Sequence, residues 1–134
     1  MKIFIYGVIA IVALGMASCS RSDAQYEKNI ADAEQLIENN PDSALAILET
    51  IDPSDFKADS LKAKLYYLKA YGHLKRNRSM IEDSLISFAH NYYRGKDIVK
   101  DMRSGMAFAW YKFWVGDTPG SIAVFDLSLI HISE

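Results

Sequence analysis

The chain has 134 residues, a formal net charge of −2, 24% charged residues and 50% hydrophobic residues. This balance is typical of one small globular domain. The near-neutral charge argues against nucleic-acid binding, which requires a concentrated basic surface. A single cysteine excludes an internal disulfide and a cysteine-rich metal site. Three prolines and seven glycines leave few chain breaks, which favours helices over many short strands.

The N-terminus has the pattern of a signal segment. Lys2 supplies a short positive region, and residues 3–16 carry no charge. As a helix this apolar run is roughly 21 Å long, which is shorter than the ~30 Å hydrocarbon core of a bilayer. A cleaved signal is therefore favoured over a permanent spanning helix.

The end of the apolar run contains the only cysteine. The small residues Ala17 and Ser18 directly precede Cys19. This arrangement resembles the lipobox of bacterial lipoproteins, with Met16 standing where that pattern prefers leucine. The resemblance implies that residues 1–18 are a lipoprotein signal peptide and that the Cys19 thiol carries a diacyl anchor.

The residues after the lipobox bear on location. Residues 19–23 are expected to form a lipid-anchored tether, and no Asp directly follows Cys19. The resemblance therefore implies a place in the cell envelope, at the periplasmic face of the outer membrane. A plain secretory signal and an uncleaved anchor are the two alternatives.

Apolar residues at three- and four-residue spacing predict a chain of helices after the tether. The expected helices cover residues 24–39, 41–51, 59–76, 79–94 and 96–116, with a sixth that begins at 118. Pro41 suits a first helical position with Asn40 as its cap. Ser79 and Glu82 have the spacing of a capping box, and Thr118 is expected to cap the last helix. In the fourth helix five residues are expected to face inward: Ile81, Leu85, Phe88, Ala89 and Tyr92.

Small residues recur at similar places in the second helix of each helical pair. These are Ala44, Ser84 and Ser121, and their positions give spacings of 40 and then 37 residues. Another small residue, Gly72 or Ala109, stands twelve positions before each of the last two. Small residues let two helices cross closely. The pattern therefore predicts repeated helical hairpins that stack on one another.

This order of residues resembles the tetratricopeptide repeat (TPR). Residues 115–122 resemble the turn between the two TPR helices, and residues 31–51 resemble the opening of TPR lipoproteins from Gram-negative anaerobes. The resemblance implies an all-α fold, a TPR-like α-hairpin array that follows an N-terminal signal segment. Its repeats are expected at about 24–52, 58–95 and 96–126, the last one incomplete. A generic α-hairpin array is the alternative, because the repeats exceed the usual 34 residues.

The last eight residues do not continue the helical pattern cleanly. Residues 127–134 resemble the translation of a sequencing adapter that has been read straight through. We therefore expect a truncated gene model, with a natural protein that continues past Asp126. A genuine short apolar end is the alternative.

The sequence contains no catalytic constellation, and we expect neither an enzyme nor a cofactor. His73, His90 and His131 have no metal-binding spacing, so we expect no metal site. Two pairs of acidic residues, Glu82 with Asp83 and Asp97 with Asp101, are interpreted as helix caps and exposed faces.

The resemblance places the first helix of each pair along a partner-binding groove. The candidate residues are Tyr66, Lys69, His73, Arg76, Arg103, Met106, Trp110, Phe113 and Trp114. Aromatic and arginine side chains are the usual anchors of interfaces. Trp110 and Phe113 can also be read as core residues. The aromatic density of residues 108–114 exceeds what one buried face can absorb, so part of it meets a neighbouring helix or a partner.

These expectations favour a membrane-anchored scaffold that binds an unknown protein or peptide. The membrane is reached through lipidated Cys19, and no nucleic acid is involved. One alternative is the N-terminal sensing half of a longer TPR-containing regulator. Another is a lipoprotein that captures glycans or nutrients, with exposed tryptophans stacking on sugar rings.

Overall fold

The structure, a computed structural model, describes residues 24–55 and 57–133. The expected signal peptide, Cys19 and the tether lie outside the described residues. Within the described part every regular element is a helix, so the expected all-α class is confirmed.

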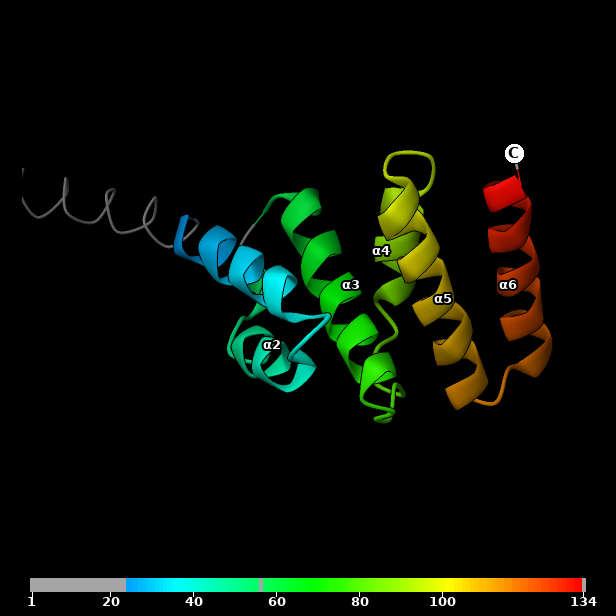
Figure 1. Cartoon of the computed structure of the whole chain (residues 1–134), viewed down its shortest axis with the longest axis horizontal. Coiled ribbons are helices and arrows are strands. Elements are labelled where there is room, and N and C mark those ends of the chain that lie inside the picture. The colour runs from blue at the N-terminus through cyan, green and yellow to red at the C-terminus, as the bar shows by residue number, and fades with distance from the viewer. Residues whose placement is uncertain (1–23, 56, 134) are drawn as a thin grey trace, which may run out of the picture.

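The helices follow one another in a row along the longest axis of the molecule (Figure 1). The N-terminal helix is described from residue 24 to residue 36. The following elements are α2 (Pro41–Leu48), the 3-10 turn η1 (Pro53–Asp55), α3 (Asp59–Lys75), α4 (Ile86–Tyr93), α5 (Ile98–Trp114) and α6 (Thr118–Ser133). Helix α3 packs against α2, α4 and α5, and α5 packs in turn against α4 and α6.

Side-chain caps explain where several helices begin. Asn40 accepts a hydrogen bond from the Ser43 amide at 3.3 Å, and Pro41 is the first residue of α2, as expected. Helix α6 begins at Thr118, but its cap is the preceding residue. The Asp117 carboxylate accepts from the Gly120 amide at 3.0 Å, so the expected cap is off by one residue.

The fourth helix begins later than its sequence predicts. Residues 79–85 are not helical and contain turns at 81–82 and 84–85, so α4 starts only at Ile86. The Ser79 hydroxyl accepts from the Ile81 amide at 3.4 Å and does not open a capping box. Ile81 and Leu85, expected to face inward, are 58% and 49% exposed, so that expectation is wrong for both.

Contacts with α3 account for this difference. Asp83 Oδ2 lies 2.8 Å from His73 Nδ1, which ties the 79–85 segment to the side of α3. Met80 is fully buried. A buried apolar side chain and a partly buried hydrogen bond outweigh the local helical preference of this short segment.

Gly72 marks a close helix crossing in the core. A Cβ atom at this position would lie 2.8 Å from Leu45 Cδ2 and 3.1 Å from Ile37 Cδ1. Gly72 therefore lies at a close crossing, as expected, and meets Leu45 of α2 and Ile37. The expectation is wrong for Ser84, which is exposed and precedes α4. The core around it is formed by buried residues of the N-terminal helix, α2, α3, α4 and α5.

Helix α6 continues through residue 133, so residues 127–133 are helical although the sequence pattern weakens there. The origin of this tail stays a prediction.

Candidate functional site

One side of α5 carries large apolar side chains that are only partly covered. They follow one another at three- or four-residue spacing, and we call them the α5 stripe: Val99, Met102, Met106, Trp110 and Phe113. Trp110 is 39% exposed and Phe113 is 54% exposed. Their rings lie 5.5 Å apart in an edge-to-face arrangement. Val99, Met102, Trp110 and Phe113 are exposed, whereas Met106 is partly buried and packs against the core. Exposed apolar side chains that gather on one side of a helix are of the kind that marks an interaction site.

The opposite side of α5 is the packed one. Phe108 lies with its ring 5.7 Å from His90 of α4, and Ser104 lies 3.4 Å from the same imidazole. At about 100° per residue these two positions lie across the helix from Met102 and Met106. The α5 stripe therefore lies on the side of α5 away from His90 of α4.

The local sequence explains why α5 is a regular helix. The Asp97 carboxylate accepts from the amides of Val99 and Lys100 at 3.1 and 3.2 Å. At the other end Gly116 adopts φ +86°, a left-handed conformation that favours glycine. These two signals fix the helix between them and give the stripe four turns of length.

A carboxylate-binding cluster lies next to the α5 stripe. Glu38 accepts from the Lys75 ammonium at 2.7 Å and from the Tyr71 hydroxyl at 2.9 Å, and it lies 3.0 Å from the Arg103 guanidinium. The Arg103 guanidinium also sits over the Tyr71 ring, 5.3 Å from its centroid. We call Tyr71, Lys75 and Arg103 the Glu38 cradle. The cradle joins three segments that are separated along the chain: the turn after the N-terminal helix, α3 and α5.

The cradle holds its carboxylate in the ionised form. The hydrogen bond from Lys75 lowers the pKa of Glu38, and Tyr71 and Arg103 add to the effect against the opposing influence of burial. Burial raises the pKa of Tyr71, and its hydrogen bond to Glu38 raises it further. Tyr71 therefore remains a neutral donor to a charged acceptor.

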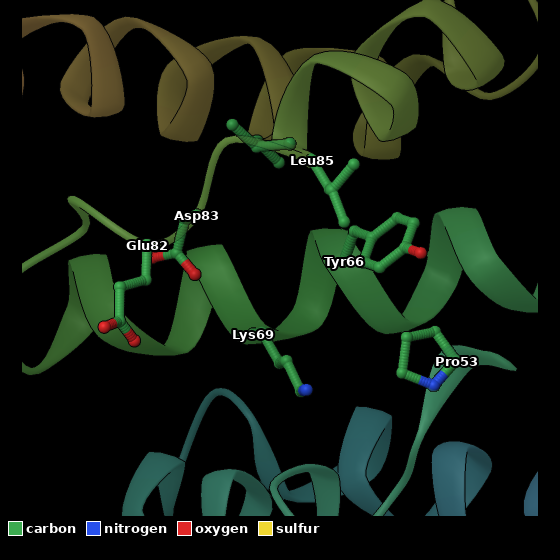
Figure 2. Close-up of a pocket in the computed structure, with 7 residues that line it drawn as sticks. Pro53, Tyr66, Lys69, Glu82, Asp83 and Leu85 are labelled. Atoms are coloured by element: carbon green, nitrogen blue, oxygen red, sulfur yellow. The ribbon is translucent and has the colours of Figure 1, made fainter.

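A hollow lies on the side of α3 away from the Glu38 cradle, and we call it the α3 cleft. It has a volume of about 150 Å³ and is lined by Pro53, Tyr66, Lys69, Glu82, Asp83, Leu85 and Ile86. Figure 2 shows Tyr66, Leu85 and Pro53 at one end, Glu82 and Asp83 at the other, and Lys69 between them. The cleft thus has an apolar end and an acidic end.

The contacts of Tyr66, His73 and Arg76 are structural. The Tyr66 ring packs edge-to-face against Phe88 at 5.9 Å. His73 is held by Asp83. Arg76 donates to Asp42 at 3.0 Å, which anchors the end of α3 to the start of α2. A partner that bound at these residues would compete with contacts that maintain the fold.

The structure divides the nine expected groove residues into two groups. Tyr66, Lys69 and His73 follow the cleft side of α3, with Arg76 at its end. Arg103, Met106, Trp110, Phe113 and Trp114 belong to α5, on or beside the stripe. Lys69 is about 200° around α3 from Tyr71, which contacts Arg103. The two groups therefore do not meet in one groove.

Sequence reasoning missed Glu38, Tyr71 and Lys75 as neighbours of Arg103. The four-residue spacing of Tyr71 and Lys75 places them on one side of α3 and is the signal that connects them. No local pattern indicates that Glu38 reaches them from another helical pair.

Neither a membrane-spanning helix nor a metal site is found among the described residues. No helix there combines the length and the apolar character needed to cross a bilayer. Within residues 24–55 and 57–133, no group of three or more His, Cys, Asp or Glu side chains is arranged to hold a metal ion.

Comparisons with known proteins add no relative. No family model, no curated protein and no solved structure matches the chain.

Proposed function

We propose that this chain is a membrane-anchored, TPR-like lipoprotein that serves as a protein- or peptide-binding scaffold in the bacterial cell envelope. The observation that carries the proposal is the α5 stripe. Trp110 and Phe113 leave 39% and 54% of their surfaces to solvent on a regular helix, next to an arginine. Aromatic residues beside arginine are the side chains on which interfaces most often depend.

The packing order supports a TPR-like array. Each of the helices α3, α4, α5 and α6 contacts its neighbour in the chain, and α3 also contacts α5. In a hairpin array every unit buries its apolar side on the next unit and leaves one extended surface for a partner. The close crossing at Gly72 agrees with the small residue that the TPR pattern places in a first helix.

The anchor is proposed from the lipobox resemblance alone. The test is incorporation of radiolabelled fatty acid into the full chain and into its Cys19→Ala variant. Label in the parent chain and none in the variant support a diacylated Cys19. Equal label in both would exclude this attachment site.

A site-specific crosslink tests the scaffold function. A photoreactive amino acid is placed at Phe113 of the lipidated chain and activated in intact cells. We expect a covalent adduct with another polypeptide. The matched control carries the same group at Ala46, an exposed position on α2. Absence of an adduct at position 113, or the same adducts at both positions, argues against binding through α5.

Glycan capture is the second candidate, and one observation favours it. Trp110 and Trp114 are 39% and 38% exposed, and indole faces stack well on sugar rings. Binding to an array of envelope polysaccharides, lost on Trp114→Ala, supports this candidate. Failure of the parent chain to bind any polysaccharide removes it.

A further inference from the structure

We propose that the partner of the α5 stripe is an amphipathic helix with acidic side chains along one edge of its apolar face. This inference rests on the proposed scaffold function and names the class of polypeptide that is bound. Its two parts are the shape of the stripe and the charge of the edge beside it.

The shape of the stripe matches the apolar face of another helix. From Val99 to Phe113 its residues advance by three or four positions along a straight helix that is capped at Asp97. At 1.5 Å per residue the stripe is roughly 21 Å long, about four turns. An amphipathic helix presents apolar residues at the same spacing, so the two rows can interdigitate.

The side chains of the stripe suit such a partner. Trp110 and Phe113 form a rigid aromatic pair at one end. Met102 and Met106 provide adaptable surface toward the other end, since unbranched thioether side chains fill irregular gaps. We expect the aromatic pair to carry most of the binding energy.

The positive charges beside the α5 stripe favour an acidic helix as the partner. Arg103 borders the stripe on the side of α3, and Lys75 lies beside it in the Glu38 cradle. Both cations already hold the carboxylate of Glu38, at 3.0 and 2.7 Å. One carboxylate between two cations leaves the edge with a net positive charge. The one acidic residue of α5, Asp101, lies 3.9 Å from His90 on the packed side of the helix, away from the stripe.

The same charges disfavour a second copy of this chain as the partner. Two stripes packed face to face would each bring an Arg103 edge to the interface, and like charges oppose such pairing. A basic helix would meet the same repulsion. An acidic helix places its carboxylates next to Arg103 and Lys75, so that opposite charges meet and neither kind of repulsion arises.

Two synthetic 18-residue helical peptides test the proposal. They share one leucine-rich apolar face and carry either glutamate or lysine along its edge. Binding to the full chain in detergent micelles is measured by fluorescence anisotropy at low salt. We expect the glutamate peptide to bind about tenfold or more tightly than the lysine peptide, because opposite charges attract and like charges repel across a close interface.

Three variants of the chain assign the effect to residues. Phe113→Ala weakens binding of the glutamate peptide about tenfold or more, as removal of an aromatic anchor does. Arg103→Gln abolishes the preference for glutamate over lysine. Glu38→Gln strengthens binding of the glutamate peptide, since it removes the carboxylate that competes for the cradle. The matched control, Ile81→Ala, changes an exposed apolar residue on the other side of α3 and leaves binding unchanged.

Several results would overturn the proposal. They are equal binding of the two peptides, no binding of either, and sedimentation as a dimer that Phe113→Ala dissociates. In the first two cases an in-cell crosslink at position 113 still supports a scaffold with a different class of partner. Loss of the crosslink as well means that the scaffold function itself has failed.

Discussion

Gly72 is the residue on which the crossing of α2 and α3 depends. We expect Gly72→Ala to lower the free energy of unfolding by about 1 kcal/mol. The added methyl overpacks Leu45 and Ile37, which costs about 1–3 kcal/mol, and this outweighs the gain of about 1 kcal/mol in helix propensity. Urea denaturation of the two proteins measures the difference.

A second substitution makes this prediction specific. In a Leu45→Val background the space around position 72 is larger, so Gly72→Ala should cost less or become stabilising. A double-mutant cycle with a coupling energy near zero would show that the close approach to Leu45 does not limit this position.

Glu38 links three segments of the chain through one ionised carboxylate. Because its pKa in the folded chain lies below the usual value of 4.5, the ionised form stabilises the fold. The stabilisation is fully present above that value and is lost as the pH falls through the lower pKa of the folded state. Glu38 is 41% exposed, so solvent screening limits the effect to about 1 kcal/mol or less.

Glu38→Gln is therefore expected to lower the free energy of unfolding at pH 7 by this small amount. The difference between the two proteins should shrink as the pH is lowered from 5 to 3. Unfolding curves across this range measure the difference. A difference that stays constant with pH would mean that hydrogen bonding rather than charge is responsible.

Helix termini show what a single side chain contributes at the level of an element. Asp97 caps α5 with two hydrogen bonds, whereas the equivalent residue of α3, Ala58, makes no side-chain cap. We expect Asp97→Ala to cost about 1 kcal/mol and Ala58→Ser to gain about 0.5–1 kcal/mol. Thermal unfolding followed by circular dichroism measures both. Changes of the same sign in the two variants would contradict the capping argument.

Prediction of the elements succeeds where the signal is local. Asn40 and Pro41 mark the start of α2 because a cap and a fixed φ act on the adjacent backbone. The start of α4 is mispredicted because it is decided by residues that are distant in the sequence. Burial of Met80 and the contact of Asp83 with His73 hold the preceding segment in turns.

The candidate site is predictable to the same limited extent. The apolar periodicity of α5 correctly selects Trp110 and Phe113 as residues on one side of a helix, and they are partly exposed. The corresponding residues of α3, such as Lys69, lie in a separate cleft. The repeat pattern fixes positions along each helix, but the rotation of one helix against the next depends on packing. Gly72 and Tyr71 decide that rotation through contacts with other helical pairs.

At the scale of the whole molecule, stability is expected to depend on position in the row of helices. Helix α3 packs against α2, α4 and α5, contacts the N-terminal helix through Lys64 and Glu34, and has seven buried residues. Helix α6 lies at the end of the row and packs principally on α5 (Figure 1). In arrays of this kind each unit is stabilised mainly by its neighbours, so a terminal helix opens more easily than an internal one.

Native-state hydrogen exchange measures this gradient directly. We expect amides in α6 to exchange through local opening at a lower free energy than those of α3, which exchange only on global unfolding. Leu68→Ala, a cavity in the centre of α3, should lower the protection of α3 by about 2–5 kcal/mol, because it removes a fully buried leucine. The free energy of local opening of α6 should change little in this variant, because that opening leaves α3 packed. The prediction is wrong if α3 and α6 are equally protected and Leu68→Ala lowers the protection of both by the same amount. The row of helices would then unfold as one cooperative unit.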